Sequence, residues 1–270
     1  MTYAPRRVVS LQPSATVILR DVGKLASLVG ATKYCRDVCP EISEMAVTIV
    51  ADSWTAQAEQ IAGLHPDLVI ASVPYQEKAI AQIMKCGARF LGLAPKSLDD
   101  IYMDIAAIAG VMDAAHEGLQ VAQKMRNEVE CVRSRTQNLP KRRVFCEEWG
   151  KPLIASQPWV AELVEAAGGD FIGKAGAQIS WEEVEQHSPD VLIAAWCGAG
   201  ERVPLEKMMA TRSWESIPAV KNAQVYCIRD EYLNTPAPTL VRGLHALAAA
   251  IHPGYFSLTD GMRQIHKTIS

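Results

Sequence analysis

Two stretches of the chain carry nearly the same pattern of polar and apolar positions. Each begins with a glutamate in a short polar run, continues through Pro-Asp, and ends in an uninterrupted apolar segment: residues 59–71 and residues 182–194. A short helix that ends at a Pro-Asp turn and leads into a fully apolar strand is typical of a parallel sheet buried on both faces. The repeat therefore predicts two similar lobes.

Other segments repeat in the same order. An apolar strand is predicted at 7–11 and again at 143–146, and a turn followed by a strand at 87–93 and again at 222–228. Ligands often bind where two lobes face each other. We therefore expect a mixed α/β fold with two Rossmann-like lobes and a ligand cleft between them.

A long helix is predicted between the lobes, at 113–138. Its expected apolar face consists of Leu119, Ala122, Met125, Val129 and Val132, which recur every three or four residues. Leu139-Pro140 ends it. The predicted division is an N-terminal lobe at 6–111, a single linking helix at 112–139 and a C-terminal lobe at 140–270, the last containing a helix at 239–251.

Composition excludes several classes of protein. Hydrophobic residues make up 49% of the 270 residues, enough for a core in each lobe. The net charge of −3 favours no nucleic-acid partner, and no apolar run approaches the roughly 18 residues of a membrane-spanning helix, so no membrane insertion is expected.

Two observations predict the compartment. The first predicted strand begins almost at Met1, which leaves no room for an export signal, and the seven cysteines are scattered and odd in number. Both favour a cytoplasmic protein. The alternative is a periplasmic or extracytoplasmic protein whose signal has been trimmed.

Aromatic residues are few, and several lie near predicted element ends. They are Trp54, Trp149, Trp181, Trp196, Tyr34, Tyr75 and Tyr232. Ligands of open parallel sheets bind beside the carboxyl ends of the strands, which favours Trp149 and Trp196. These aromatics are therefore candidate ligand contacts.

Catalytic chemistry finds no support in the sequence. Cys35 and Cys39 lack the second ligand pair of a zinc site, and phosphate-binding and nucleophile motifs are absent. We expect no catalytic residue, no metal site and no catalytic cofactor.

Four segments carry a resemblance to a known family: residues 7–19, residues 28–30, residues 65–70 and residues 161–169. With Ser10-x-x-Pro13-Ser14-Ala15-Thr16 and the paired Pro-Asp motifs, the chain resembles the substrate-binding proteins of metal-chelate ABC importers. It is most similar to their cobalamin-binding branch. The resemblance implies two lobes on one helix that clamp a corrinoid such as cobalamin. Haem and ferric-siderophore binders share this scaffold and are the alternatives, and an enzyme acting in the cleft is a third hypothesis.

The resemblance also implies residue roles. Tyr34, Trp54, Trp149 and Tyr232 match ligand-contacting positions, and Glu231 matches an acidic position beside Tyr232; Trp181 and Trp196 are candidates by topology alone. Glu59 and Glu182 open the two repeats, and the corresponding pair in the family docks onto arginines of the membrane permease. Without an export signal, a cytosolic corrinoid-binding module is the competing hypothesis to an importer component.

Overall fold

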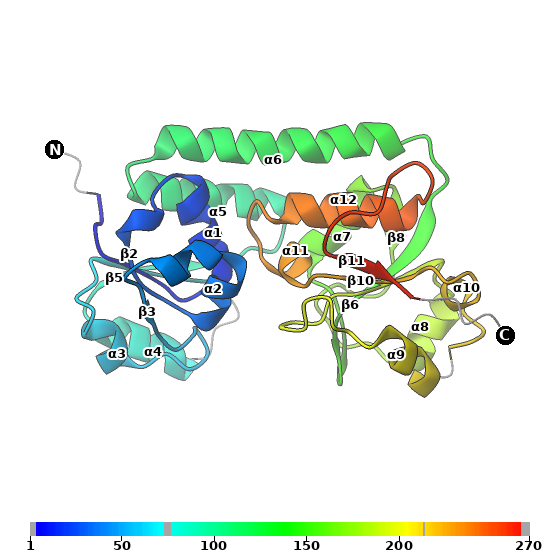
Figure 1. Cartoon of the computed structure of the whole chain (residues 1–270), viewed down its shortest axis with the longest axis horizontal. Coiled ribbons are helices and arrows are strands. Elements are labelled where there is room, and N and C mark those ends of the chain that lie inside the picture. Colours follow the sequence, from blue (N-terminus) through cyan, green and yellow to red (C-terminus); the bar gives the residue numbers. More distant parts are fainter. Residues whose placement is uncertain (1–3, 73–76, 213, 266–270) are drawn as a thin grey trace. The chain divides into compact units, whose positions relative to one another are not determined.

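The computed structural model describes residues 4–72, 77–212 and 214–265, which belong to two compact units (Figure 1). Unit 1 contains Met1–Lys124 and Pro236–Pro238, and unit 2 contains Met125–Thr235 and Thr239–Ser270. The boundary between them falls inside the long helix α6, Ala115–Thr136. The mixed α/β fold with two parallel-sheet lobes is confirmed. The separate linker at 112–139 stays a prediction.

Unit 1 is built on a five-stranded parallel sheet with the order β3-β2-β1-β4-β5. Its strands are β1 (Val8–Ser10), β2 (Leu28–Ala31), β3 (Thr48–Ile49), β4 (Leu68–Ser72) and β5 (Arg89–Leu93). Every residue of β4 is buried, as the unbroken apolar run in the sequence predicts for a strand covered on both faces. Because all five strands are parallel, their carboxyl ends share one edge of the sheet.

Helices cover both faces of this sheet (Figure 1). Alternate strand residues such as Val9 and Val69 pack with Ile61 and Ile83, which lie on α3 (Ala58–Ala62) and α4 (Glu77–Lys85). The opposite face carries α1 (Pro13–Asp21) and α5 (Leu98–Val111), with α2 (Lys33–Val38) beside α1. Two 3-10 turns, Leu25–Ser27 and Pro40–Glu44, complete the unit.

Unit 2 contains a mixed sheet with the order β11-β10-β9-β6-β7, and β8 pairs with β6 off this path. The strands are β6 (Arg142–Gly150), β7 (Leu153–Ala155), β8 (Gly169–Phe171), β9 (Val191–Ala194), β10 (Val225–Ile228) and β11 (Met262–Gln264). The strands β6, β8, β9 and β10 run parallel, while β7 and β11 are antiparallel. The repeated strand of the sequence, β9, again lies inside the sheet.

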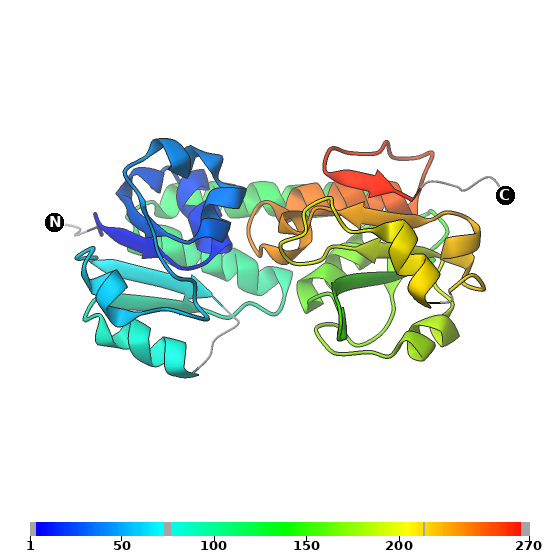
Figure 2. The same ribbon diagram turned by 60° about the horizontal axis from the view of Figure 1, so that its bottom comes forward.

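The helices of unit 2 also form two layers, as both views show (Figures 1 and 2). On one face are α7 (Pro158–Ala166) and α12 (Leu240–Ile251); on the other are α8 (Trp181–His187), α9 (Leu205–Arg212) and α10 (Pro218–Lys221), and α11 (Glu231–Asn234) follows β10. Gly169 illustrates how tightly β8 packs: a Cβ there would lie 2.8 Å from Val144 and 2.9 Å from Val164. The predicted C-terminal helix is confirmed as α12.

The sequence repeat has the same local geometry in each unit. The Asp67 carboxylate accepts the backbone N–H of Arg7 at 3.2 Å, and the Asp190 carboxylate accepts that of Arg143 at 2.9 Å. The residues before the two prolines, His65 and Ser188, are both left-handed, with φ of 46° and 50°. The two segments therefore share their backbone geometry as well as their sequence pattern. Each Pro-Asp turn ties the entry of one strand to the first strand of its unit.

The predicted apolar face of the long helix was wrong at one residue, Leu119. Ala122, Met125, Val129 and Val132 are buried on α6, but Leu119 is 66% exposed. The neighbouring Gly118 faces α5 instead, where a Cβ would lie only 2.3 Å from the Cβ of Ala109. Close approach of the two helices selects a glycine at this point, and Leu119 turns outward.

The carboxyl group of Asp104 on α5 has a raised pKa because it is partly buried. Desolvation, with a smaller contribution from the charge of Asp100, raises its pKa to about 6. The pKa of this carboxyl is higher in the folded chain than in the unfolded chain. The folded chain is therefore most stable at low pH, where Asp104 is protonated, and it loses stability as the pH rises through about 6. We expect Asp104→Asn to raise the free energy of unfolding by about 1 kcal/mol at pH 7.

Thermal melts at several pH values test this expectation. The gain from Asp104→Asn should shrink toward pH 4, where the wild-type carboxyl is protonated. Glu44→Gln is the control, because it removes one negative charge from an exposed side chain. A gain that does not depend on pH would contradict the role of titration.

Candidate functional site

The carboxyl edge of the unit 1 sheet carries the candidate side chains of the first half. Tyr34 follows β2, and Trp54 lies in the loop after β3. This loop is tied to the end of β1, because the Ser53 hydroxyl donates a hydrogen bond to the Leu11 carbonyl at 3.1 Å. Loops after neighbouring parallel strands thus meet at one edge, which is the usual ligand side of such sheets.

Tyr34 is held at the start of α2. The Thr32 hydroxyl caps this helix by accepting the backbone N–H of Cys35 at 3.2 Å. Tyr34 is 39% exposed, and the Lys33 ammonium lies 4.8 Å from the centroid of its ring. At this distance the cation is attracted to the face of the ring.

Trp54 is presented by a tight turn. One oxygen of Asp52 accepts the backbone N–H groups of Trp54 and Thr55, each at 3.1 Å, and so holds the loop backbone in place. Trp54 is nevertheless 44% exposed. The turn is ordered while the aromatic surface stays open. The third aromatic predicted for this half, Tyr75, lies outside the described residues.

In unit 2 the carboxyl edge is formed by the end of β6 and the loops after β9 and β10. Trp149, near the end of β6, is 44% exposed, and its indole N–H donates to the Lys151 carbonyl at 2.9 Å. The backbone N–H of Cys197 donates to the Glu148 carbonyl at 3.3 Å, which joins the loop after β9 to β6. Trp149 is therefore a fixed, open aromatic at this edge.

Trp196 and Trp181 differ from Trp149 in being partly buried against the core of unit 2. The Trp196 indole N–H donates to Oε1 of Glu147 at 2.8 Å. The ring of Trp181 lies under the Arg212 guanidinium, 5.6 Å from its centroid. The structure thus gives both indoles partners within unit 2, where Trp181 begins α8 and Trp196 follows β9.

Glu231 and Tyr232 lie on α11 after β10, but both already have partners. Glu231 forms an ion pair with Arg229 at 2.7 Å. Tyr232 is only 5% exposed, and the centroid of its ring lies 5.9 Å from the Arg229 guanidinium and 5.6 Å from that of Arg242. Little of the Tyr232 surface is open to a ligand, so its predicted contact stays a prediction.

Sequence reasoning missed a polar cluster at the same edge. The Glu148 carboxylate accepts the Gln157 amide at 2.7 Å, and burial raises the pKa of Glu148. Beside it, burial and the charges of Glu148 and Asp230 raise the pKa of the Cys197 thiol. The signal was present as two consecutive acids inside an apolar strand. A raised pKa keeps a thiol protonated and lowers its nucleophilicity.

Glu59 and Glu182 occupy equivalent positions. Each is the second residue of its helix, α3 or α8, and each side chain is exposed. Both helices begin on the carboxyl side of the sheet and run back toward the entry of the next strand. The two repeats therefore present one carboxylate each on corresponding surfaces of their units.

A profile of periplasmic binding proteins matches residues 8–232, which is most of the chain. The chain belongs to the periplasmic binding protein family. Among its relatives is the vitamin B12-binding protein of Vibrio vulnificus (strain CMCP6), 30% identical over 243 residues that cover 86% of this chain and 85% of the relative. This family consists of binding proteins.

Solved structures agree with the family assignment. The periplasmic vitamin B12-binding protein BtuF of Vibrio cholerae is 25% identical with a TM-score of 0.74, covering 92% of this chain and 96% of that one. The periplasmic heme-binding protein RhuT from Roseiflexus sp. RS-1 shares the fold, with a TM-score of 0.81 at 22% identity and coverage of 93% and 99%. The predicted resemblance to importer-type binding proteins is confirmed.

The expected cytoplasmic location is wrong. The family and the similar solved structures are periplasmic, which indicates an extracytoplasmic protein. The cysteine argument failed because Cys35, Cys39, Cys146 and Cys227 are buried thiols that pack as small apolar side chains. The argument from Met1 failed because the residue at which a sequence starts does not show what precedes it.

The described part of the chain contains no cluster of three or more His, Cys, Asp or Glu side chains that could hold a metal ion. It also contains no helix that is both long and apolar enough to cross a bilayer.

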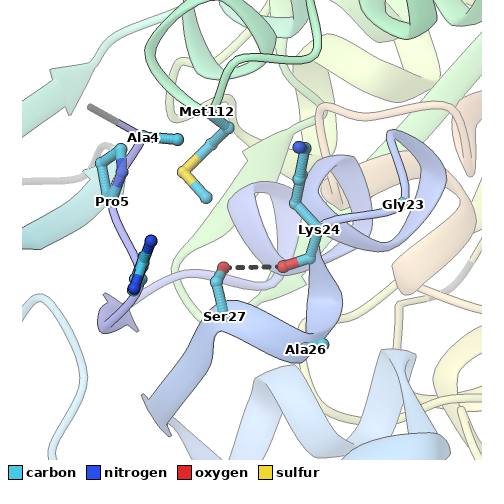
Figure 3. Close-up of a pocket in the computed structure, with 8 residues that line it drawn as sticks. Ala4, Pro5, Gly23, Lys24, Ala26, Ser27 and Met112 are labelled. Atoms are coloured by element: carbon cyan, nitrogen blue, oxygen red, sulfur yellow. Dashed lines mark hydrogen bonds between the residues drawn. The ribbon is translucent and has the colours of Figure 1, made fainter. Parts of the chain in front are cut away.

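A cavity of about 450 Å³ lies at the opposite, amino edge of unit 1 (Figure 3). It is lined by Ala4, Pro5, Arg6, Gly23, Lys24, Ala26, Ser27 and Met112. Arg6 precedes β1 and Ser27 precedes β2, whose other ends lead to the candidate aromatics. The Ser27 hydroxyl donates to the Lys24 carbonyl at 2.7 Å (Figure 3). This cavity is separate from the candidate site.

Proposed function

We propose that this protein is the substrate-binding component of an ABC importer and binds a corrinoid, with cobalamin as the first candidate. The observation that carries the proposal is the set of open aromatic side chains at the carboxyl edges: Tyr34 and Trp54 in unit 1 and Trp149 in unit 2. Relatives named as vitamin B12-binding proteins support the choice of ligand. The cleft predicted between the units stays a prediction.

Aromatic surface suits a large, flat chelate. A macrocycle carries its metal in a broad plane, and aromatic rings contribute apolar area together with stacking geometry. The described loops at the carboxyl edges contain no histidine. A bound corrinoid would therefore keep its own lower ligand. We propose no enzymatic activity, because the family consists of binding proteins.

Haem is the second candidate ligand, since the exposed phenol of Tyr34 could coordinate iron where no imidazole is at hand. Purified protein should be titrated with cyanocobalamin, haem and ferric siderophores while visible spectra and tryptophan fluorescence are recorded. Cobalamin should quench fluorescence at the lowest concentration. Tighter binding of haem, with a phenolate band in its spectrum, would replace cobalamin by the second candidate.

Replacing Trp54 or Trp149 by alanine should weaken cyanocobalamin binding by about 1–3 kcal/mol, because each variant removes a large apolar contact. Affinity is measured by isothermal titration calorimetry. Tyr255→Ala is the matched control: Tyr255 is 66% exposed but follows α12, away from the strand ends. If both tryptophan variants bind like the wild type, these residues are not in the site.

We also propose that Glu59 and Glu182 dock the protein onto its permease. Their equivalent helix positions and exposed side chains support the proposal, as does membership of an importer-related family. Paired carboxylates on corresponding surfaces suit a partner that presents cationic side chains at two places.

A further inference from the structure

Glu147 is the centre of a buried polar network at the carboxyl end of β6. Its two oxygens accept hydrogen bonds from the Arg212 guanidinium at 2.6 and 2.7 Å, and the same carboxylate accepts the Trp196 indole N–H at 2.8 Å. Glu147 is 1% exposed and Arg212 8%. A bidentate pair of this kind has one favoured geometry, so it fixes the direction in which the carboxylate meets Trp196.

Arg212 is held as firmly as its partner. Its guanidinium lies 4.9 Å from the ring centroid of Trp214 and 5.6 Å from that of Trp181. Trp214 is itself 1% exposed. Packing against two indoles immobilises the cation, and the cation in turn immobilises Glu147.

Gly150 restricts Trp196 from a second side. A Cβ on Gly150 would lie 2.6 Å from Cζ2 of Trp196 and 3.1 Å from both Cε2 and Cη2. Real side chains do not tolerate the shortest of these distances, so the benzene part of the indole rests directly on the glycine backbone. The indole is thus held at its N–H by Glu147 and over one face of its benzene ring by Gly150.

We propose that Glu147 and Gly150 are positioning residues that hold the Trp196 indole as a pre-oriented contact for the flat face of the bound chelate. This inference rests on the proposed function. A ring already fixed in its bound orientation loses little conformational entropy when a ligand stacks on it, which raises affinity. The buried ion pair then serves recognition through Trp196, although neither charge touches the ligand.

A double-mutant cycle tests the inference, because Gly150 is proposed to affect ligand binding only through the Trp196 side chain. Gly150→Ala should displace the indole and weaken cyanocobalamin binding by about tenfold, the equivalent of about 1.4 kcal/mol. In the Trp196→Ala background no ring remains to be displaced, so Gly150→Ala should then leave the affinity unchanged. Gly110→Ala is the control, since a Cβ there would meet nothing within 4 Å.

Trp196→Phe separates the hydrogen bond from the ring. It keeps an aromatic surface and removes the donor to Glu147, so its affinity should fall between those of the wild type and Trp196→Ala. Thermal unfolding of every variant, measured without ligand, distinguishes loss of position from loss of the fold.

Equal weakening by Gly150→Ala in both backgrounds would overturn the inference and leave the proposed function intact. Wild-type affinity in Trp196→Ala would overturn it as well, because the indole would then contribute nothing. A wild-type chain that binds neither cyanocobalamin nor haem would refute the proposed function, and the inference with it.

Discussion

Glu147→Gln is expected to lower the free energy of unfolding of unit 2 by about 3–5 kcal/mol. The Glu147 and Arg212 side chains are 2% and 4% exposed, and the pair is bidentate. A glutamine keeps the shape of the side chain but removes its charge. The Arg212 guanidinium would then be buried without a carboxylate to accept its two hydrogen bonds, which is among the costliest changes to a core.

Urea unfolding of the ligand-free protein measures this loss. Asp170→Asn is the control, because Asp170 pairs with Lys141 at the surface, where the side chains are 52% and 66% exposed. Exposed pairs of this kind contribute less than about 1 kcal/mol. Replacing Glu147 and Arg212 together by methionine should recover much of the stability, since no unpaired charge remains. A cost for Glu147→Gln no greater than that of Asp170→Asn would contradict the expectation.

Reversing Glu59 and Glu182 together to lysine is expected to abolish uptake of cobalamin by cells and to leave binding of cobalamin unchanged. Both side chains are exposed at the second position of their helices, so the fold does not depend on their charge. Two lysines facing cationic groups of a permease would repel it, and like charges across an interface cost several kcal/mol. Each single reversal should give a partial loss.

Cobalamin-dependent growth and calorimetric binding are the two measurements. Glu44→Lys with Glu215→Lys is the matched control, because it makes the same change of charge at one exposed glutamate in each unit. Normal growth of the Glu59→Lys, Glu182→Lys variant would remove these residues from docking. If the variant no longer binds cobalamin, the loss of growth would instead result from the loss of ligand binding.

The repeated pattern was enough to predict most of the architecture. Pro66 and Pro189 mark strand entries in both units, and the predicted strands and the C-terminal helix are present. These features depend on local periodicity and turn chemistry, which a sequence carries directly. The site was predicted less completely. Trp54 and Trp149 are exposed, whereas Tyr232 is buried beside two arginines, and the ligand contacts of all three stay predictions.

By itself the sequence determined the two-lobed α/β fold and its family. Both can be predicted from short local segments that occur in the same order in each half of the chain or in the family. Only the tertiary structure decided which candidate side chains are open and which are enclosed. Glu147 and Arg212 are 65 residues apart, and Trp196 is 49 residues from Glu147. Contacts over such separations depend on how β6, β9 and α9 pack together. Local patterns carry no record of that packing, so the polar network beneath Trp196 became visible only in the folded chain.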